Sequence, residues 1–335
     1  MKRIVPVLAC LLTVGASPLA MARYEDQDSE SIRLGYVPSE VRQLVVVRPE
    51  KILKNDAVRE LKQLSGEVFD KMLNRMMNQY FKFSLTDFDE IEYILQADWF
   101  SKREGDNGRR SRGNNTILLV KTINDQTDKF DMATHAVKSE AEYKGQTIFQ
   151  MNNFVNRQYK YACILDEKSI VWARHDYSIK QMIDVGPKGP KNSELLNAWN
   201  QFSDSPMSFA IQIPQREMRF APPNLQALEN MEFAAAGIKL GKTATIKVMG
   251  LCNSDDGAEK VMEAAEQNLD LGKQMIQRRA AADAKNRDIY PILLDFAESI
   301  EMKQQGKEVQ ATASANINVK SLAKPLKQVY EAQVR

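Results

Sequence analysis

The spacing of hydrophobic and polar positions changes repeatedly along this chain, from alternation to three- and four-residue repeats. Short runs that are apolar or alternating, and rich in β-branched residues, predict strands. These runs lie at 41–47, 91–100, 116–123, 146–151, 159–165, 170–175, 208–213, 233–240, 243–251 and 308–317. Apolar residues three and four positions apart predict helices. The helical segments begin at Pro49 and lie at 56–80, 128–141, 179–183, 194–202, 223–229, 256–276, 292–300 and 322–330.

Local signals sharpen two of these boundaries. Lys144 and Gly145 predict a tight turn that leads into the strand at 146–151. The spacing of Asp256 and Glu259 is that of a capping box, so Asp256 is the predicted cap of the long helix behind it.

The two halves of the chain share an order of elements: a strand that ends near a proline, a helix, two strands and further helices. This order predicts an α+β fold of two similar lobes, each an antiparallel sheet packed with helices. We place the lobes at 36–203 and 204–335. The shared order also raises an internal duplication as a hypothesis.

The first 22 residues have the pattern of a secretory signal peptide. Lys2 and Arg3 precede a short apolar run, and Ala20-Met21-Ala22 supplies the small residues of a cleavage site. Because the apolar run is shorter than the roughly 20 residues of a membrane-spanning helix, we expect cleavage near Ala22–Arg23. A retained N-terminal anchor is the alternative. Export to the periplasm or the extracellular space follows, with 23–35 as a flexible mature N-terminus and no transmembrane segment in the mature chain.

The net charge bears on the class of partner, and the cysteine content bears on disulfide bonding. The 46 basic residues, less Lys2 and Arg3, equal the 44 acidic ones, so the mature chain is formally neutral. Neutrality argues against a nucleic-acid partner. Cys163 and Cys252 would remain after cleavage, and both lie in apolar runs. We expect two buried free thiols, with a disulfide between them as the alternative.

Several segments resemble an uncharacterised family of exported bacterial proteins. They are GYVPSEVRQLVVVRP and DFDEIEYILQADW, and more loosely YKGQTIFQM and ILDEKSIVWARHDYSIKQMI, all in the first half of the chain. The resemblance implies an exported two-lobed fold. It supplies no catalytic residues, because the family has no agreed activity.

The chain offers little support for catalysis or for a cofactor. With two histidines, it has no multi-histidine metal site, and no nucleophile elbow, P-loop or dinucleotide fingerprint is present. His175 and Asp176 are adjacent and could orient a base, but a histidine on the surface is the simpler interpretation. We therefore predict no catalytic residues, no metal and no cofactor.

The predicted helix at 56–80 ends in a methionine-rich, aromatic surface. Its members are Met72, Met76, Met77, Tyr80 and Phe81. Methionine adapts to irregular partners, so a groove for a partner or a lipid is one hypothesis. Packing against a sheet is the commoner cause of such a stripe and is the preferred one.

A basic segment between the strands at 91–100 and 116–123 is the remaining candidate site. Its cations are Lys102, Arg103, Arg109, Arg110 and Arg112. Glycines and asparagines among them favour a solvated connection between two paired strands. Contact with an anion or an acidic polymer is the functional alternative.

Three functional hypotheses remain open. The first is an exported, non-catalytic cell-envelope protein that binds an envelope protein or polymer. The second is a carrier of an apolar ligand in a groove between sheet and helices. The third is an enzyme of unfamiliar type that uses carboxylates from distant segments between the lobes.

Replacing Arg109, Arg110 and Arg112 with serine tests the solvated-connection interpretation. We expect a melting temperature within a few degrees of the wild-type value, because surface substitutions change stability by only about 0.5 kcal/mol. A clear drop in the melting temperature would show instead that the segment packs against the fold.

Overall fold

A computed structural model describes residues 35–38, 41–68, 88–96, 115–122, 137–151, 159–189, 193–241, 243–282, 290–316 and 319. The chain divides into two compact units. The N-terminal unit comprises Glu30–Lys51 and Asn74–Asn200, and the C-terminal unit comprises Met1–Ser29, Ile52–Leu73 and Gln201–Arg335. The boundary between Asn200 and Gln201 lies close to the predicted lobe boundary at 203/204. Residues Ile52–Leu73, which we placed in the first lobe, belong instead to the C-terminal unit. Within the described ranges, no helix is long and apolar enough to cross a membrane.

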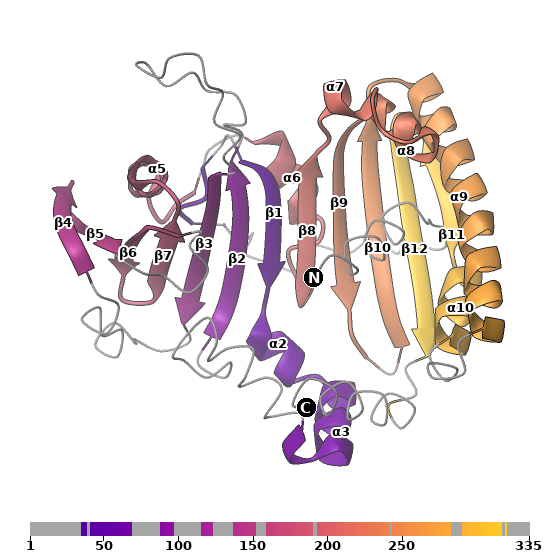
Figure 1. The fold of residues 1–335 in the computed structure, drawn as a ribbon, viewed down its shortest axis with the longest axis horizontal. Coiled ribbons are helices and arrows are strands. Elements are labelled where there is room, and N and C mark those ends of the chain that lie inside the picture. The colour runs from indigo at the N-terminus through magenta and orange to yellow at the C-terminus, as the bar shows by residue number, and fades with distance from the viewer. Residues whose placement is uncertain are drawn as a thin grey trace, which may run out of the picture. The chain divides into compact units, whose positions relative to one another are not determined.

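Antiparallel strands and helices make up both units, which confirms the predicted α+β fold (Figure 1). Internal duplication stays a hypothesis. The strands of the N-terminal unit follow the order β1-β2-β3-β7-β6-β5-β4. Their bounds are β1 Val41–Val47, β2 Phe88–Gln96, β3 Asn115–Thr122, β4 Val137–Tyr143, β5 Gln146–Met151, β6 Tyr161–Asp166 and β7 Ser169–Ala173.

Two strands that the sequence separates by a basic segment are neighbours in this sheet. β2 pairs antiparallel with β3, as the sequence predicts. In the centre of the sheet, the side chains of Ile117, Leu119 and Val171 are fully buried. Two helices belong to the same unit, α5 Asp176–Val185 and α6 Glu194–Asn200. α5 contacts β5, β6 and β7 and buries Ile179 and Met182 completely.

The predicted helix at 128–141 is wrong for its last five residues. Residues Val137–Tyr143 form the edge strand β4, which pairs with β5. Lys144 and Gly145 both have positive φ, 50° and 79°, which is the backbone of a two-residue hairpin turn. Because the turn returns the chain onto β5, pairing overrides the helix preference of the lysine, glutamate and alanine residues in β4. The rest of the predicted helix lies outside the described residues.

Residues 35–38 form a short strap at the start of the N-terminal unit. The Tyr36 N–H donates to the Gly186 carbonyl at 2.8 Å, and its hydroxyl donates to Asp166 Oδ2 at 2.8 Å. A Cβ on Gly35 would lie 2.6 Å from the carbonyl oxygen of Pro187, so only glycine fits there. Burial first, and then the hydrogen bond to Asp166, raise the pKa of Tyr36.

The strands of the C-terminal unit follow the order β8-β9-β10-β12-β11. Their bounds are β8 Met207–Gln212, β9 Met231–Lys239, β10 Thr243–Cys252, β11 Glu301–Gln305 and β12 Glu308–Asn316. The helical segments are α2 Pro49–Leu53, which begins in the N-terminal unit, α3 Asp56–Ser65, α7 Gln215–Met218, α8 Pro223–Gln226, the 3₁₀ turn η4 Ala227–Asn230, α9 Asp255–Ala282 and α10 Tyr290–Glu298. The sequence did not predict β11, four of whose five residues are polar and exposed.

The long helix α9 begins where the sequence predicts, but Asp256 is not its cap. The hydroxyl of Ser254 accepts the Gly257 N–H at 3.0 Å, so Ser254 has that role. The inward side of α9 contributes Ala258 and Val261 to a core with Ala234 and Val309.

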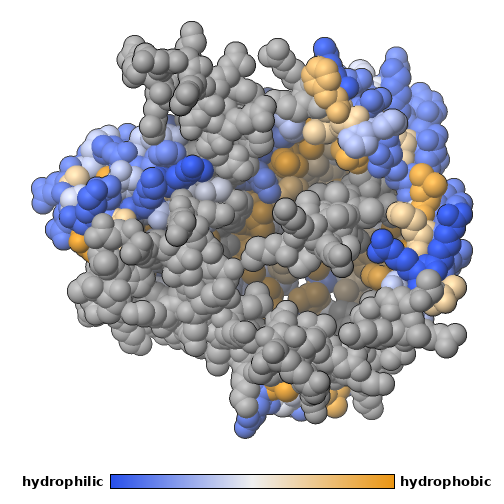
Figure 2. Space-filling model, in the orientation of Figure 1, coloured by the Kyte–Doolittle hydropathy of each residue, from blue (hydrophilic) through white to orange (hydrophobic). Residues whose placement is uncertain are grey.

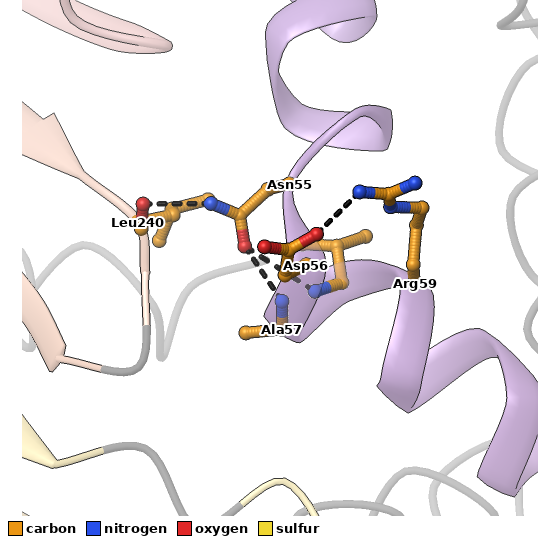
Figure 3. A network of polar contacts seen from close by, with 6 residues as sticks. Asn55, Asp56, Ala57, Arg59 and Leu240 are labelled. Carbon is orange, nitrogen blue, oxygen red and sulfur yellow. Dashed lines mark hydrogen bonds and ion pairs between the residues drawn. The ribbon is translucent and has the colours of Figure 1, made fainter.

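Asn55 connects α3 to the hairpin of β9 and β10 (Figure 3). Its Oδ1 accepts the N–H groups of Ala57 at 3.0 Å and Val58 at 3.4 Å. Its Nδ2 donates to the Leu240 carbonyl at 2.7 Å. One side chain therefore caps the helix and fixes its first turn to the end of β9.

The structure describes only the first part of the predicted helix at 56–80, as the shorter helix α3, so packing of the methionine-rich surface against a sheet stays a prediction. α3 ends at Ser65, and Gly66 follows with a φ of 58°. No α3 residue is buried, and Leu64 is 47% exposed. Met72, Met76, Met77, Tyr80 and Phe81 lie outside the described residues.

Removing the Tyr36 hydroxyl tests the strap. We expect Tyr36→Phe to lower the free energy of unfolding by about 1–2 kcal/mol, because the part-buried hydrogen bond to a carboxylate is lost. Tyr143→Phe, which removes an exposed hydroxyl, should change it by less than about 0.5 kcal/mol.

The pH dependence of the free energy of unfolding, measured by chemical denaturation, is a second test of the Tyr36 hydrogen bond. The unfolded-state pKa of tyrosine is about 10, and that of folded Tyr36 is higher. Its contribution is therefore fully present below about pH 10 and is lost as the pH rises further. The stability difference between wild type and Tyr36→Phe should narrow in that range, and equal stabilities at neutral pH would contradict the strap.

Candidate functional site

The predicted basic site falls outside the described residues. Lys102, Arg103, Arg109, Arg110 and Arg112 all lie between β2 and β3, in a segment for which no structure is described. Contact of these side chains with an anion or an acidic polymer stays a prediction.

The strongest candidate site is a sheet surface in the C-terminal unit. Residues opposite each other on antiparallel strands point to the same face. One row across the sheet is Met207, Ile238, Ile246 and Ala313, and the next is Phe209, Ala236, Val248 and Ala311. We call the six residues on β8, β9 and β10 the apolar face: Met207, Phe209, Ala236, Ile238, Ile246 and Val248.

Register also shows which side of the sheet this face occupies. The neighbouring row runs through Ala234, Gly250 and Val309, with Ala234 and Val309 packed against Ala258 and Val261 of α9. The apolar face therefore continues the side of the sheet on which α9 packs. Its edge on β12 is covered, because Ala311 and Ala313 are only 9% and 5% exposed.

The apolar face is only partly covered over β8, β9 and β10. All six residues of the apolar face are half-buried. On β8 and β9 their neighbours on the opposite face are buried, with Ala210 and Ala235 at 0% exposure, whereas Lys247 on β10 is exposed. Over these strands, Figure 2 shows hydrophobic atoms at depth.

The opposite face is closed by its own segment of the C-terminal unit. A Cβ on Gly237 would lie 2.4 Å from Ser205 Oγ and 2.8 Å from Phe202 Cδ1. Residues 202–205 therefore press directly on the backbone of β9, and a glycine is required for that approach.

The chemistry of the apolar face suits a hydrocarbon. None of its six residues is charged or carries a hydroxyl or amide side chain. Strands lie about 4.8 Å apart and same-face residues about 7 Å apart along a strand, so the face is about 10 Å wide. A surface of this size and polarity can hold an acyl chain or another narrow apolar group.

A polar cluster lies at the end of the β4–β5 hairpin in the N-terminal unit. Lys144 Nζ lies 2.6 Å from Asp184 Oδ1, and the Tyr143 hydroxyl is 3.1 Å from both carboxylate oxygens. The hydrogen bond from Lys144 lowers the pKa of Asp184. Because both lysines near the Tyr143 ring, Lys144 and Lys180, already pair with carboxylates, the cluster holds the hairpin on α5 without forming an anion site.

His175 and Asp176 each have another neighbour. The His175 ring stacks on Tyr177 with the centroids 5.4 Å apart, and Asp176 accepts a hydrogen bond from Lys180 at 2.7 Å. No group of three or more metal-binding side chains occurs within the described ranges.

The apolar face was not found from the sequence as a site. Its strands were predicted, and a groove between sheet and helices was one hypothesis, but no single run marks the face. The usable signal is the alternation in β8, where Met207, Phe209 and Ile211 share one side.

Comparisons with known proteins leave the family open. No protein-family model matches the chain, and no curated protein of similar sequence was found. A solved structure described as crystal form III of TP0453 aligns with 88% of this chain and 98% of that chain. The TM-score is 0.42 and the sequence identity is 7%. At this level of similarity the comparison carries no functional argument, and the resemblance to an exported bacterial family stays a prediction.

Both cysteines of the expected mature chain are buried free thiols. Burial raises the pKa of Cys163 to about 12 and, as the larger of two causes, that of Cys252 to about 11. Since the thiolate is the reactive species, neither thiol is suited to be a nucleophile in the folded protein.

Thiol labelling of the chain that begins at Arg23 tests this assignment. Near neutral pH, we expect both cysteines to react with an aromatic disulfide reagent at least about 100-fold more slowly than in denaturing urea. Rapid labelling of either cysteine in the folded protein would contradict the assignment.

Proposed function

We propose that this chain is an exported, non-catalytic binding protein of the cell envelope, and that its C-terminal unit holds an apolar ligand. The signal-peptide pattern supports export. The apolar face of β8, β9 and β10 carries the binding part of the proposal. The enzymatic hypothesis and an envelope polymer as partner both stay predictions.

The contrast between the two sides of one sheet is the main support. Half-buried apolar residues occupy the side on which α9 packs, whereas the other side of β8 and β9 is closed by 202–205. Leaving apolar surface in water costs about 25 cal/mol per Å². A ligand that covers the face would recover that free energy.

The distribution of exposed hydrophobic residues is a second support. The large hydrophobic side chains exposed within the described ranges all belong to the C-terminal unit. They are Leu64, Phe220, Leu251, Leu271, Met275 and Leu293. We therefore assign binding to this unit rather than to the N-terminal unit.

Fluorescence titration with N-phenyl-1-naphthylamine, an apolar probe, tests the proposal on the chain that begins at Arg23. We expect saturable binding, and a dissociation constant about ten-fold higher for Phe209→Ser or Ile246→Ser, because a hydroxyl would then face the hydrocarbon.

Leu251→Ser is the matched control. Leu251 is a partly exposed leucine on β10 that points to the opposite face of the sheet. The Leu251→Ser variant should bind the probe as tightly as the wild type does. Circular dichroism should show that Phe209→Ser, Ile246→Ser and Leu251→Ser are all folded. No saturable binding by the wild type, or the same loss in all three variants, would refute the proposal.

A further inference from the structure

A stripe of basic and apolar side chains follows the outer side of α9. Leu271 is 54% exposed and Met275 is 49% exposed, one helical turn apart. Positions three and four apart continue the line in both directions. The α9 stripe, as we call it, consists of Lys260, Ala264, Gln267, Leu271, Met275 and Arg278.

Basic and acidic side chains lie along two different lines on the surface of α9. The two charged members of the α9 stripe, Lys260 and Arg278, are both basic. The acidic residues of the same part of the helix have their own three- and four-residue spacing, and so form a separate line. They are Glu259, Glu263, Glu266 and Asp270.

Phe220 provides a second exposed apolar group, at 87% exposure. Its turn is braced on both sides: the Ala221 N–H donates to the Met218 carbonyl at 3.0 Å, and the Leu225 N–H donates to the Pro222 carbonyl at 2.8 Å. The Phe220 ring is therefore presented to solvent on a hydrogen-bonded turn.

One hydrogen bond relates this turn to the α9 stripe. The Asn268 side chain donates to the Asn224 carbonyl at 2.9 Å. Asn268 lies three residues before Leu271, on the flank of α9 away from the acidic line. The segment that carries Phe220 therefore adjoins α9 on the Leu271 side. Figure 2 shows hydrophobic atoms among hydrophilic ones over α9.

We propose that the α9 stripe and Phe220 together bind the surface of an anionic lipid bilayer. Leucine, methionine and phenylalanine side chains enter the boundary between headgroups and acyl chains, while lysine and arginine pair with the anionic headgroups. Lys260 and Arg278 are about 27 Å apart along the helix, so the contact follows a line on the membrane. This surface is separate from the apolar face, and the inference does not depend on the proposed function.

Vesicle co-sedimentation tests the inference on the chain that begins at Arg23. The probes are vesicles of phosphatidylcholine mixed with phosphatidylglycerol, and of phosphatidylcholine alone. We expect binding to the mixed vesicles that weakens with added salt. Leu271→Ser combined with Met275→Ser, and separately Phe220→Ser, should each reduce the partition coefficient about ten-fold.

Charge variants separate a lipid contact from a loss of folding. Arg278→Glu should reduce the partition coefficient at least about five-fold, since one basic residue near the surface is worth about 1 kcal/mol. Glu263→Gln on the acidic line and Leu251→Ser should bind at least as well as the wild type. Phe209→Ser should also leave vesicle binding unchanged, which distinguishes this surface from the proposed ligand site.

Two results would overturn the inference. One is absence of binding to the mixed vesicles, or binding equal to that of phosphatidylcholine alone. The other is binding that is unchanged in Arg278→Glu and in the Leu271 and Met275 double variant while circular dichroism shows both folded.

Discussion

The antiparallel register of β8, β9, β10 and β12 is the constraint on which the C-terminal unit depends. Because opposed residues share a face, pairing Phe209 with Ala236, and Val248 with Ala236 and Ala311, makes four separate segments into one apolar surface. A shift by one residue would move every one of these side chains to the other face. The packing of α9, the closure by residues 202–205 and the apolar face all follow from this register.

Two parts of that surface differ in how completely they are covered. Alanines on β12 allow close cover, and Ala311 and Ala313 are buried. Larger side chains at Phe209, Ile238 and Ile246 remain half-buried. The same side of the sheet thus contributes a packed core near β12 and the half-buried apolar face over β8 to β10, with no change in chemical character between them.

Helix α9 has a corresponding double role. Ala258 and Val261 face the sheet and complete the core, whereas Leu271 and Met275 face solvent. The N-terminal unit differs, since its hairpin end is held by charged pairs around Asp184 and its exposed surface carries no large hydrophobic residue within the described ranges. Carrying an apolar ligand and contacting a lipid surface are compatible tasks for the C-terminal unit, and each rests on different side chains.

Much of the local structure could be predicted from the sequence by itself, because it depends on neighbouring residues. The valine-rich run at 41–47 forms β1, Lys144 and Gly145 form a turn, and the alternation around Val309 and Ala311 gives a strand with one buried face. The cysteines are also the buried free thiols that their apolar surroundings suggest. Asp256 failed as a cap because Ser254, two residues earlier, accepts the Gly257 N–H.

Tertiary structure decided the rest. The residues at 137–141 have helical preferences, but the hairpin turn pairs them with β5, and contacts made through pairing outweigh a preference of a few tenths of a kcal/mol per residue. The apolar face joins positions that are up to about 40 residues apart within β8 to β10, and register with β12 adds positions more than 60 residues further on. Pattern and composition could therefore determine which segments are strands and which of their residues are apolar. Which of those residues would be covered depended on the pairing of distant strands and on where α9 packs, because burial is a property of the assembled sheet and not of any one segment.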